Sequence, residues 1–167
     1  PQIAERRARI SAPAEVPYLI LGYHVPVLAS DDKSYEPYAL DVLSAILGGG
    51  NSSRLARELV REQKLAASAD AGYSPIARSP GMLMLDGSPA TGHTIDELER
   101  ALRAQVARLR EQPVTAEELN RVKAQVVAGN IYARDSVMGQ AMQIGQLAVS
   151  GLDWRLQDTF VRRLKAV

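Results

Sequence analysis

The stretch that decides the fold runs from Leu40 to Tyr73 and reads LDVLSAILGGGNSSRLARELVREQKLAASADAGY. Its first part places apolar residues at helical spacing up to Leu47. The three glycines at 48–50 end this predicted helix, because glycine readily adopts the left-handed backbone found just past helix ends. Asn51–Ser53 can cap a second helix, and the small residues of Ala66–Tyr73 predict a strand after it.

The segments on either side complete a pattern of strands and helices. Ile3–Ile10 has extended character, and the short apolar run Tyr18–Val25 predicts a buried strand. The compact apolar run Met82–Leu85 predicts another strand. Ser30–Ser34 predicts a loop and a helix start. Four more helices are predicted to begin near Thr94, Thr115, Val137 and Asp153. Strands do not alternate singly with helices, so we expect an α+β domain in two layers, with helices packed on one face of a mainly antiparallel sheet.

Composition excludes several classes of function. The 167 residues suit a single domain, 1–167. With 20 basic and 19 acidic residues, the chain has no general attraction for nucleic acid, and Arg6, Arg7 and Arg9 are interpreted as a solvated strand face. The absence of cysteine excludes disulfides, thiolate zinc sites and cysteine nucleophiles. No apolar run is long enough to predict a transmembrane segment.

The residues with catalytic potential are few. A catalytic zinc needs three protein ligands, but His24 and His93 are the only histidines and are far apart, so we interpret them as a packed strand-end residue and a surface loop residue. Ser74 follows Gly72 but lacks the rest of a nucleophile elbow. The glycines at 48–50 lack the lysine of a phosphate-binding loop. Acidic pairs fall in helix first turns, and four arginines are interpreted as one helix's solvated side: Arg100, Arg103, Arg108 and Arg110.

Beyond these local patterns, the chain resembles the C-terminal domains of the pitrilysin/insulinase family of zinc metallopeptidases. The resemblance is carried by YLILGYHVP at 18–26, by GGGNSSRL at 48–55 and by the R-E-x-x-L-A segment beginning at Arg61. Looser likeness continues through PGMLMLDGSP to about Gly151. The resemblance implies a fold like that of the mitochondrial processing peptidase-like metallohydrolase domains.

The family's members are two-lobed enzymes whose N-terminal lobe carries zinc on an H-x-x-E-H helix. No such motif is present here, so the resemblance implies the zinc-free C-terminal lobe, with zinc expected in an N-terminal lobe and none in this chain. The start at Pro1 without an initiator methionine, and the stop inside an apparent amphipathic helix, suggest a fragment of a longer protein. A bacterial periplasm or cell envelope is the location suspected from the resemblance.

The family's best-known contacts to the bound peptide come from an arginine and a tyrosine seven positions apart. The matching arginine is Arg61, but the residue seven positions on is Ser68. We expect Arg61 and Ser68 to be the substrate-binding residues, with a surface salt bridge from Arg61 to Glu58 or Glu62 as the alternative. Tyr73 is not a replacement, because an odd separation from Ser68 places it on the opposite strand face.

Two readings of function follow from the resemblance. In the first, the chain closes the chamber and positions a peptide for a metal site on another lobe. In the second, it is an inactive structural subunit that pairs with a homologous active subunit. A third class, an independent hydrolase, is disfavoured by the two isolated histidines. In either leading reading the chain is inactive alone, and its partners are another lobe or subunit and a peptide.

Overall fold

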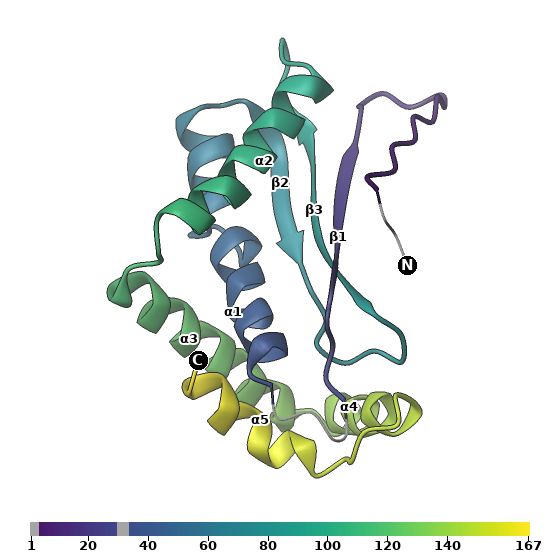
Figure 1. Cartoon of the computed structure of the whole chain (residues 1–167), viewed down its shortest axis with the longest axis vertical. Helices are drawn as coiled ribbons and strands as arrows, with labels where there is room; N and C mark the ends of the chain where they lie inside the picture. Colours follow the sequence, from purple (N-terminus) through teal and green to yellow (C-terminus); the bar gives the residue numbers. More distant parts are fainter. Residues whose placement is uncertain (1–3, 30–33) are drawn as a thin grey trace.

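The computed structural model describes residues 4–29 and 34–167. One antiparallel sheet of three strands lies beside a layer of helices (Figure 1). Its strands are β1 (Leu19–Val25), β2 (Ala66–Gly72) and β3 (Gly81–Pro89). The order across the sheet is β1-β3-β2, so the central strand pairs on both sides. The predicted α+β class, with helices on one face of an antiparallel sheet, is confirmed.

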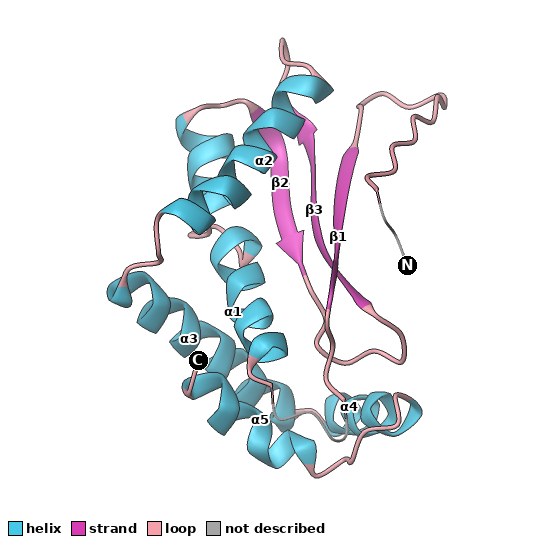
Figure 2. Ribbon diagram, viewed as in Figure 1, coloured by secondary structure: helices cyan, strands magenta, loops and turns pink. Residues whose placement is uncertain are grey.

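The helices account for most of the remaining chain (Figure 2). Two of them are not α-helices: η1 is a π-helix, and η2 is a short 3-10 helix. None of the helices in the described ranges is both long and apolar enough to cross a membrane. In chain order the helical elements are α1 (Glu36–Gly48), η1 (Ala56–Glu62), α2 (Ile95–Glu111), α3 (Ala116–Tyr132), η2 (Ala133–Asp135), α4 (Val137–Val149) and α5 (Leu156–Lys165).

Two hydrophobic clusters hold these elements together. The first lies between the sheet and the helices α1, η1 and α2, and includes Leu59, Leu85 and Leu102, each buried. The second joins α1 to the C-terminal helices α3, α4 and α5 around Tyr38 and Phe160, whose rings are 5.2 Å apart. Because α1 contributes to both clusters, it ties the sheet half of the domain to the helical half.

The glycines at 48–50 do more than end α1. A Cβ on Gly48 would lie only 2.0 Å from the backbone nitrogen of Ala71, because the end of α1 is pressed directly against β2. Gly50 has a φ of 90°, a left-handed conformation that favours glycine. The motif therefore combines a backbone-to-backbone contact with the reversal of the chain into η1.

Several element boundaries differ from those predicted. The strand expected at Ile3–Ile10 is absent from its described residues, 4–10, and Ile3 lies outside the described ranges. The apolar residues of this segment do not alternate with its charged ones, so no face can be buried, and Ile10 is 89% exposed. Of the loop predicted at Ser30–Ser34, residues 30–33 lie outside the described ranges.

Two further differences have local causes. β3 is longer than the predicted run Met82–Leu85, because pairing with both neighbouring strands extends it to Pro89. The last helix begins at Leu156 rather than at Asp153, since the Asp153 side chain accepts a hydrogen bond from the backbone nitrogen of Arg155 in a preceding turn.

Candidate functional site

One face of the sheet is left uncovered by the helices. Strand alternation places Leu83 and Leu85 against the helices, where they are buried, and leaves their neighbours Met82 and Met84 43% and 37% exposed. Ile20 on β1 is 55% exposed. We call this surface the open face, and it comprises Ile20, Gly22, His24, Ser68, Asp70, Gly72, Met82, Met84, Asp86 and Ser88.

The open face is apolar toward one end and polar toward the other. Met84 lies between Gly22 and Gly72 in the strand register, so no neighbouring side chain covers it from either side. At the polar end, Ser68 pairs in register with Ser88. The Tyr18 hydroxyl donates a hydrogen bond to Asp86, and this bond raises the pKa of Tyr18. Such a surface offers both apolar contacts and hydrogen-bonding groups to an extended ligand.

Arg61 lies near the end of η1 and is exposed. The salt bridge from Arg61 to Glu58 or Glu62, its alternative role, does not form, because Arg57 pairs with both carboxylates. Arg57 lies 3.1 Å from Glu58 and 3.8 Å from Glu62. Within the described part of the chain, Arg61 makes no ion pair or hydrogen bond of its own. Its guanidinium group is thus available to a ligand.

Ser68 lies on β2 at the polar end of the open face, just after a register shift between residues 66 and 68. Tyr73, by contrast, packs against the sheet-side hydrophobic cluster, as its odd separation from Ser68 predicts. Its hydroxyl donates to the Pro26 carbonyl at 2.6 Å. Burial, with smaller contributions from Asp41 and Glu36, raises the pKa of Tyr73 to about 12. No hydrogen bond joins Arg61 to Ser68 among the described residues.

The π-helix is held in place by the buried carboxylate of Glu58, which the sequence suggested only as a surface partner of Arg61. Glu58 is only 8% exposed, and it accepts hydrogen bonds from Arg108, from Gln105 at 2.8 Å and from Arg57 at 3.1 Å. Burial alone would raise the pKa of Glu58, but these hydrogen bonds outweigh it and lower the pKa to about 2. The only sequence signal is an acidic residue next to the buried Leu59.

The arginine of the S-S-R-L motif has a structural partner in the helical half of the domain. Arg54 makes two hydrogen bonds to Glu118, at 3.0 and 2.6 Å, a geometry that matches the planar guanidinium to a carboxylate. These bonds lower the pKa of Glu118. At the predicted helix start, the Thr115 side chain accepts a hydrogen bond from the Glu118 backbone nitrogen at 3.2 Å, while the Glu118 side chain binds Arg54.

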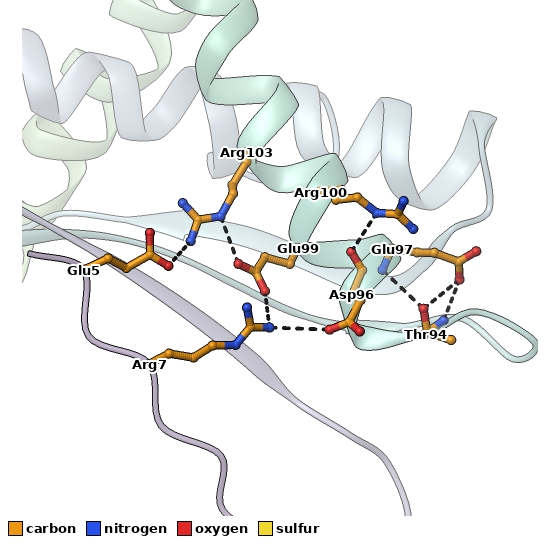
Figure 3. A network of polar contacts seen from close by, with 8 residues as sticks. All are labelled: Glu5, Arg7, Thr94, Asp96, Glu97, Glu99, Arg100 and Arg103. Carbon is orange, nitrogen blue, oxygen red and sulfur yellow. Dashed lines mark hydrogen bonds and ion pairs between the residues drawn. The ribbon is translucent and has the colours of Figure 1, made fainter.

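The arginines of α2 are not simply a solvated side of the helix, contrary to the prediction. Arg108 bonds Glu58, and Arg103 lies 2.9 Å from Glu99 and 2.7 Å from Glu5. Figure 3 shows how Arg103 joins α2 to the N-terminal segment, with Arg7 reaching Glu99 and Asp96 from the same segment. The prediction that Arg7 is only a solvated strand residue is therefore wrong as well.

The described residues do not fit a zinc ion. They contain no cluster of three or more histidine, aspartate or glutamate side chains able to hold a metal. His24 is exposed on the open face, so it is not packed as predicted, and His93 lies 3.5 Å from Glu97 beside the start of α2. Since a catalytic zinc requires three protein ligands, no metal chemistry is assigned to the residues that the structure describes.

A comparison with protein-family models settles the family. Residues 1–126 match the model described as the peptidase M16 inactive domain. This chain belongs to that family. The M16 inactive domain is the zinc-free type of domain that the sequence resemblance indicated. A curated relative, the zinc protease PqqE of Helicobacter pylori, is 30% identical over 106 residues, or 64% of this chain.

Solved structures share the fold. A protease from Helicobacter pylori superposes with a TM-score of 0.83 at 23% identity over 94% of this chain. The M16 inactive domain from Pseudomonas fluorescens gives 0.74 at 22% identity over 90%. This chain spans only 23% of the curated relative, 37% of the Helicobacter structure and 34% of the Pseudomonas one. These three proteins therefore contain substantially more chain than this M16 inactive domain.

Proposed function

We propose that this M16 inactive domain is the peptide-binding lobe of a zinc metallopeptidase. It closes a chamber and positions an extended peptide for a metal site carried on another lobe. The observation that carries the proposal is the open face, an uncovered sheet surface whose Ile20, Met82 and Met84 stay exposed while Leu83 and Leu85 on the opposite face are buried. Burying such side chains under an extended peptide would contribute favourably to binding, since apolar area is removed from water.

Arg61 supports the same proposal. An exposed arginine beside two glutamates would ordinarily pair with one of them, but Arg57 engages both. Arg61 can donate to a peptide carbonyl or carboxylate without first breaking an intramolecular ion pair. Ser68 offers a second, weaker hydrogen-bonding group on the open face itself. In this proposal Arg61 binds the peptide backbone and Ser68 makes a secondary contact.

The test uses peptide cleavage by the full-length parent protein that carries the zinc-bearing lobe. Arg61→Ala is expected to lower kcat/KM roughly tenfold, the equivalent of one charge-assisted hydrogen bond. Its thermal unfolding should not change, because the side chain has no intramolecular partner to lose. Arg110→Ala, which removes another exposed arginine without an ion pair, is the matched control and should leave kcat/KM unchanged. Unaltered cleavage by the Arg61 variant would contradict the assigned role.

The second candidate is an inactive structural subunit that pairs with a homologous active chain. The observation that favours it is the serine at position 68, where a tyrosine would complete the family's peptide-contacting pair. Sequencing the parent gene upstream of Pro1 distinguishes the two proposals. An H-x-x-E-H helix in the same polypeptide supports the peptide-binding lobe of an active enzyme, whereas its absence supports the partner subunit.

A further inference from the structure

Two acidic residues lie close to Arg61 on the π-helix η1, yet neither of them binds it. Glu58 is three positions before Arg61, and Glu62 directly follows it. Arginine and glutamate side chains within one helical turn of each other commonly form an ion pair. Arg61 forms none within the described ranges. Another group must therefore keep Glu58 from pairing with Arg61.

That group is Arg57, which contacts both carboxylates. Its Nη2 donates a hydrogen bond to Oε1 of Glu58 at 3.1 Å, and its Nε lies 3.8 Å from Oε1 of Glu62. The hydrogen bonds of a π-helix join residues five positions apart, as the Gln63 nitrogen and the Glu58 carbonyl show at 2.9 Å. Arg57 and Glu62 are also five positions apart, so the π-helical geometry brings this pair onto successive turns.

The two oxygens of the Glu58 carboxylate are held by different elements. Oε2 accepts hydrogen bonds from Gln105, at 2.8 Å, and from Arg108, both on α2. Among the residues that the structure describes, Oε1 accepts only from Arg57. Glu58 is 8% exposed, so Oε1 would have little water to replace that donor if Arg57 were removed. The other arginine of η1, Arg61, would then be drawn to Glu58.

We propose that Arg57 is a positioning residue for peptide binding, because it occupies Glu58 and Glu62 and so keeps Arg61 unpaired. The inference rests on the proposed function, in which Arg61 binds the peptide. Arg57 acts through Arg61 and needs no contact with the peptide. Glu58 is the stronger competitor for Arg61, since Glu62 is 60% exposed and adjacent residues of a helix do not face each other.

The first test is peptide cleavage by the full-length parent protein, with kcat and KM measured separately. Arg57→Ala should raise KM roughly threefold to fivefold with little change in kcat, because Arg61 must leave Glu58 before it binds the peptide. Arg54→Ala is the matched control, since it removes an arginine whose glutamate partner, Glu118, lies outside η1. The control should lower stability without raising KM. An unchanged KM for Arg57→Ala, in an enzyme whose cleavage does respond to Arg61→Ala, would overturn the proposal.

A second substitution separates positioning from stability. Glu58→Gln removes the charge that would capture Arg61, so Arg57→Ala/Glu58→Gln should return KM to within about twofold of the parent value, a coupled rather than additive effect. A purely structural role for Arg57 predicts the opposite, because both substitutions remove interactions of a buried group and the double variant should perform worst. Arg57→Lys, which keeps a cation beside both carboxylates, should hold KM close to the parent value. A KM that stays high in a double variant shown by circular dichroism to be folded would overturn the proposal.

Titration of the Glu58 carboxyl by NMR gives a readout that needs neither a peptide nor a zinc-bearing lobe. In the 167-residue chain, Arg61→Ala should leave the pKa of Glu58 unchanged, because the two side chains are not in contact. In the Arg57→Ala chain, the same substitution should raise the pKa of Glu58, since it removes a cation from the carboxylate. Equal effects of Arg61→Ala in both backgrounds would contradict the capture of Arg61. Capture in the titration, together with a KM that does not respond to Arg61→Ala, would overturn the proposed function and this inference with it.

Discussion

The two faces of the sheet are formed by the same three strands, but helices cover one face and leave the other exposed. On the covered face, Leu83 and Leu85 are buried beneath helices, and the buried carboxylate of Glu58 accepts hydrogen bonds from Gln105 and Arg108. On the open face, Met82 and Met84 remain exposed between glycines and polar side chains. The difference teaches that an apolar side chain at the centre of β3 is either buried in the core or left exposed on the face proposed to bind peptide, depending on which way it points.

The largest expected effect is on the covered face. Leu85→Ala removes a fully buried side chain from the cluster between the sheet and the helices. The free energy of unfolding should fall by about 3 kcal/mol, the combined loss of burial and a residual cavity. Chemical denaturation monitored by circular dichroism measures it. A loss as small as that of an exposed residue would mean that the helices do not pack on this face as described.

Glu58→Gln tests whether the charge on the covered side is structural. The folded-state pKa of about 2 lies below the ordinary value of 4.5, so ionisation stabilises the fold above about pH 5. This contribution is lost as pH falls from about 4.5 to about 2. We expect the variant to be about 2 kcal/mol less stable at pH 7, a figure reduced for the partial exposure of Arg108, and nearly equal to the parent near pH 2. Denaturation curves across this pH range provide the measurement.

Asp41→Asn should change the stability in the opposite direction and make the protein more stable. Burial within α1 raises the pKa of Asp41 to about 6, and its carboxylate has no ion pair or hydrogen bond among the described residues. The charged form is therefore destabilising above about pH 6, and this penalty vanishes as pH falls below about 4. The asparagine variant should be about 1 kcal/mol more stable at pH 8 and no more stable at pH 4. Thermal melts of both proteins at the two pH values measure this difference. Greater stabilisation at the lower pH would contradict the raised pKa of Asp41.

The smallest effect on stability should come from the open face. Met84→Ala removes an exposed side chain, so the free energy of unfolding should change by less than about 0.5 kcal/mol. Peptide cleavage by the parent enzyme should nevertheless weaken through a higher KM, because an apolar contact to the peptide is lost. An unchanged KM together with a lower stability of the Met84 variant would mean that the open face contributes to folding rather than to peptide binding.

The order of elements could be predicted from the sequence because its signals are local. Glycines at 48–50, the capping threonine Thr94 and the apolar runs each depend on neighbouring residues. The two faces of β3 could not be separated, since Met82–Leu85 is apolar at every position and lacks the alternation that marks a half-exposed strand. The strand predicted to be buried, Tyr18–Val25, is likewise exposed at every second residue of β1, so that prediction was only half right.

The candidate site was less predictable because its determinants are long-range. Arg61 could be chosen from the family resemblance, but its lack of a partner depends on Arg57 engaging both neighbouring glutamates. The hydrogen bond between Glu58 and Arg108 joins residues fifty positions apart, a pairing that no helical period reveals. The roles of Arg61 and Ser68 in binding stay predictions.

The contact between Gly48 and the backbone of Ala71 sets a spacing within the molecule. Elsewhere side chains such as Leu59 and Leu85 lie between the helices and the sheet, but here the end of α1 contacts β2 main chain to main chain. A single methyl group at position 48 would push the end of α1 away from β2. The π-helix that follows, with the unpaired guanidinium group of Arg61, would then move away from the sheet.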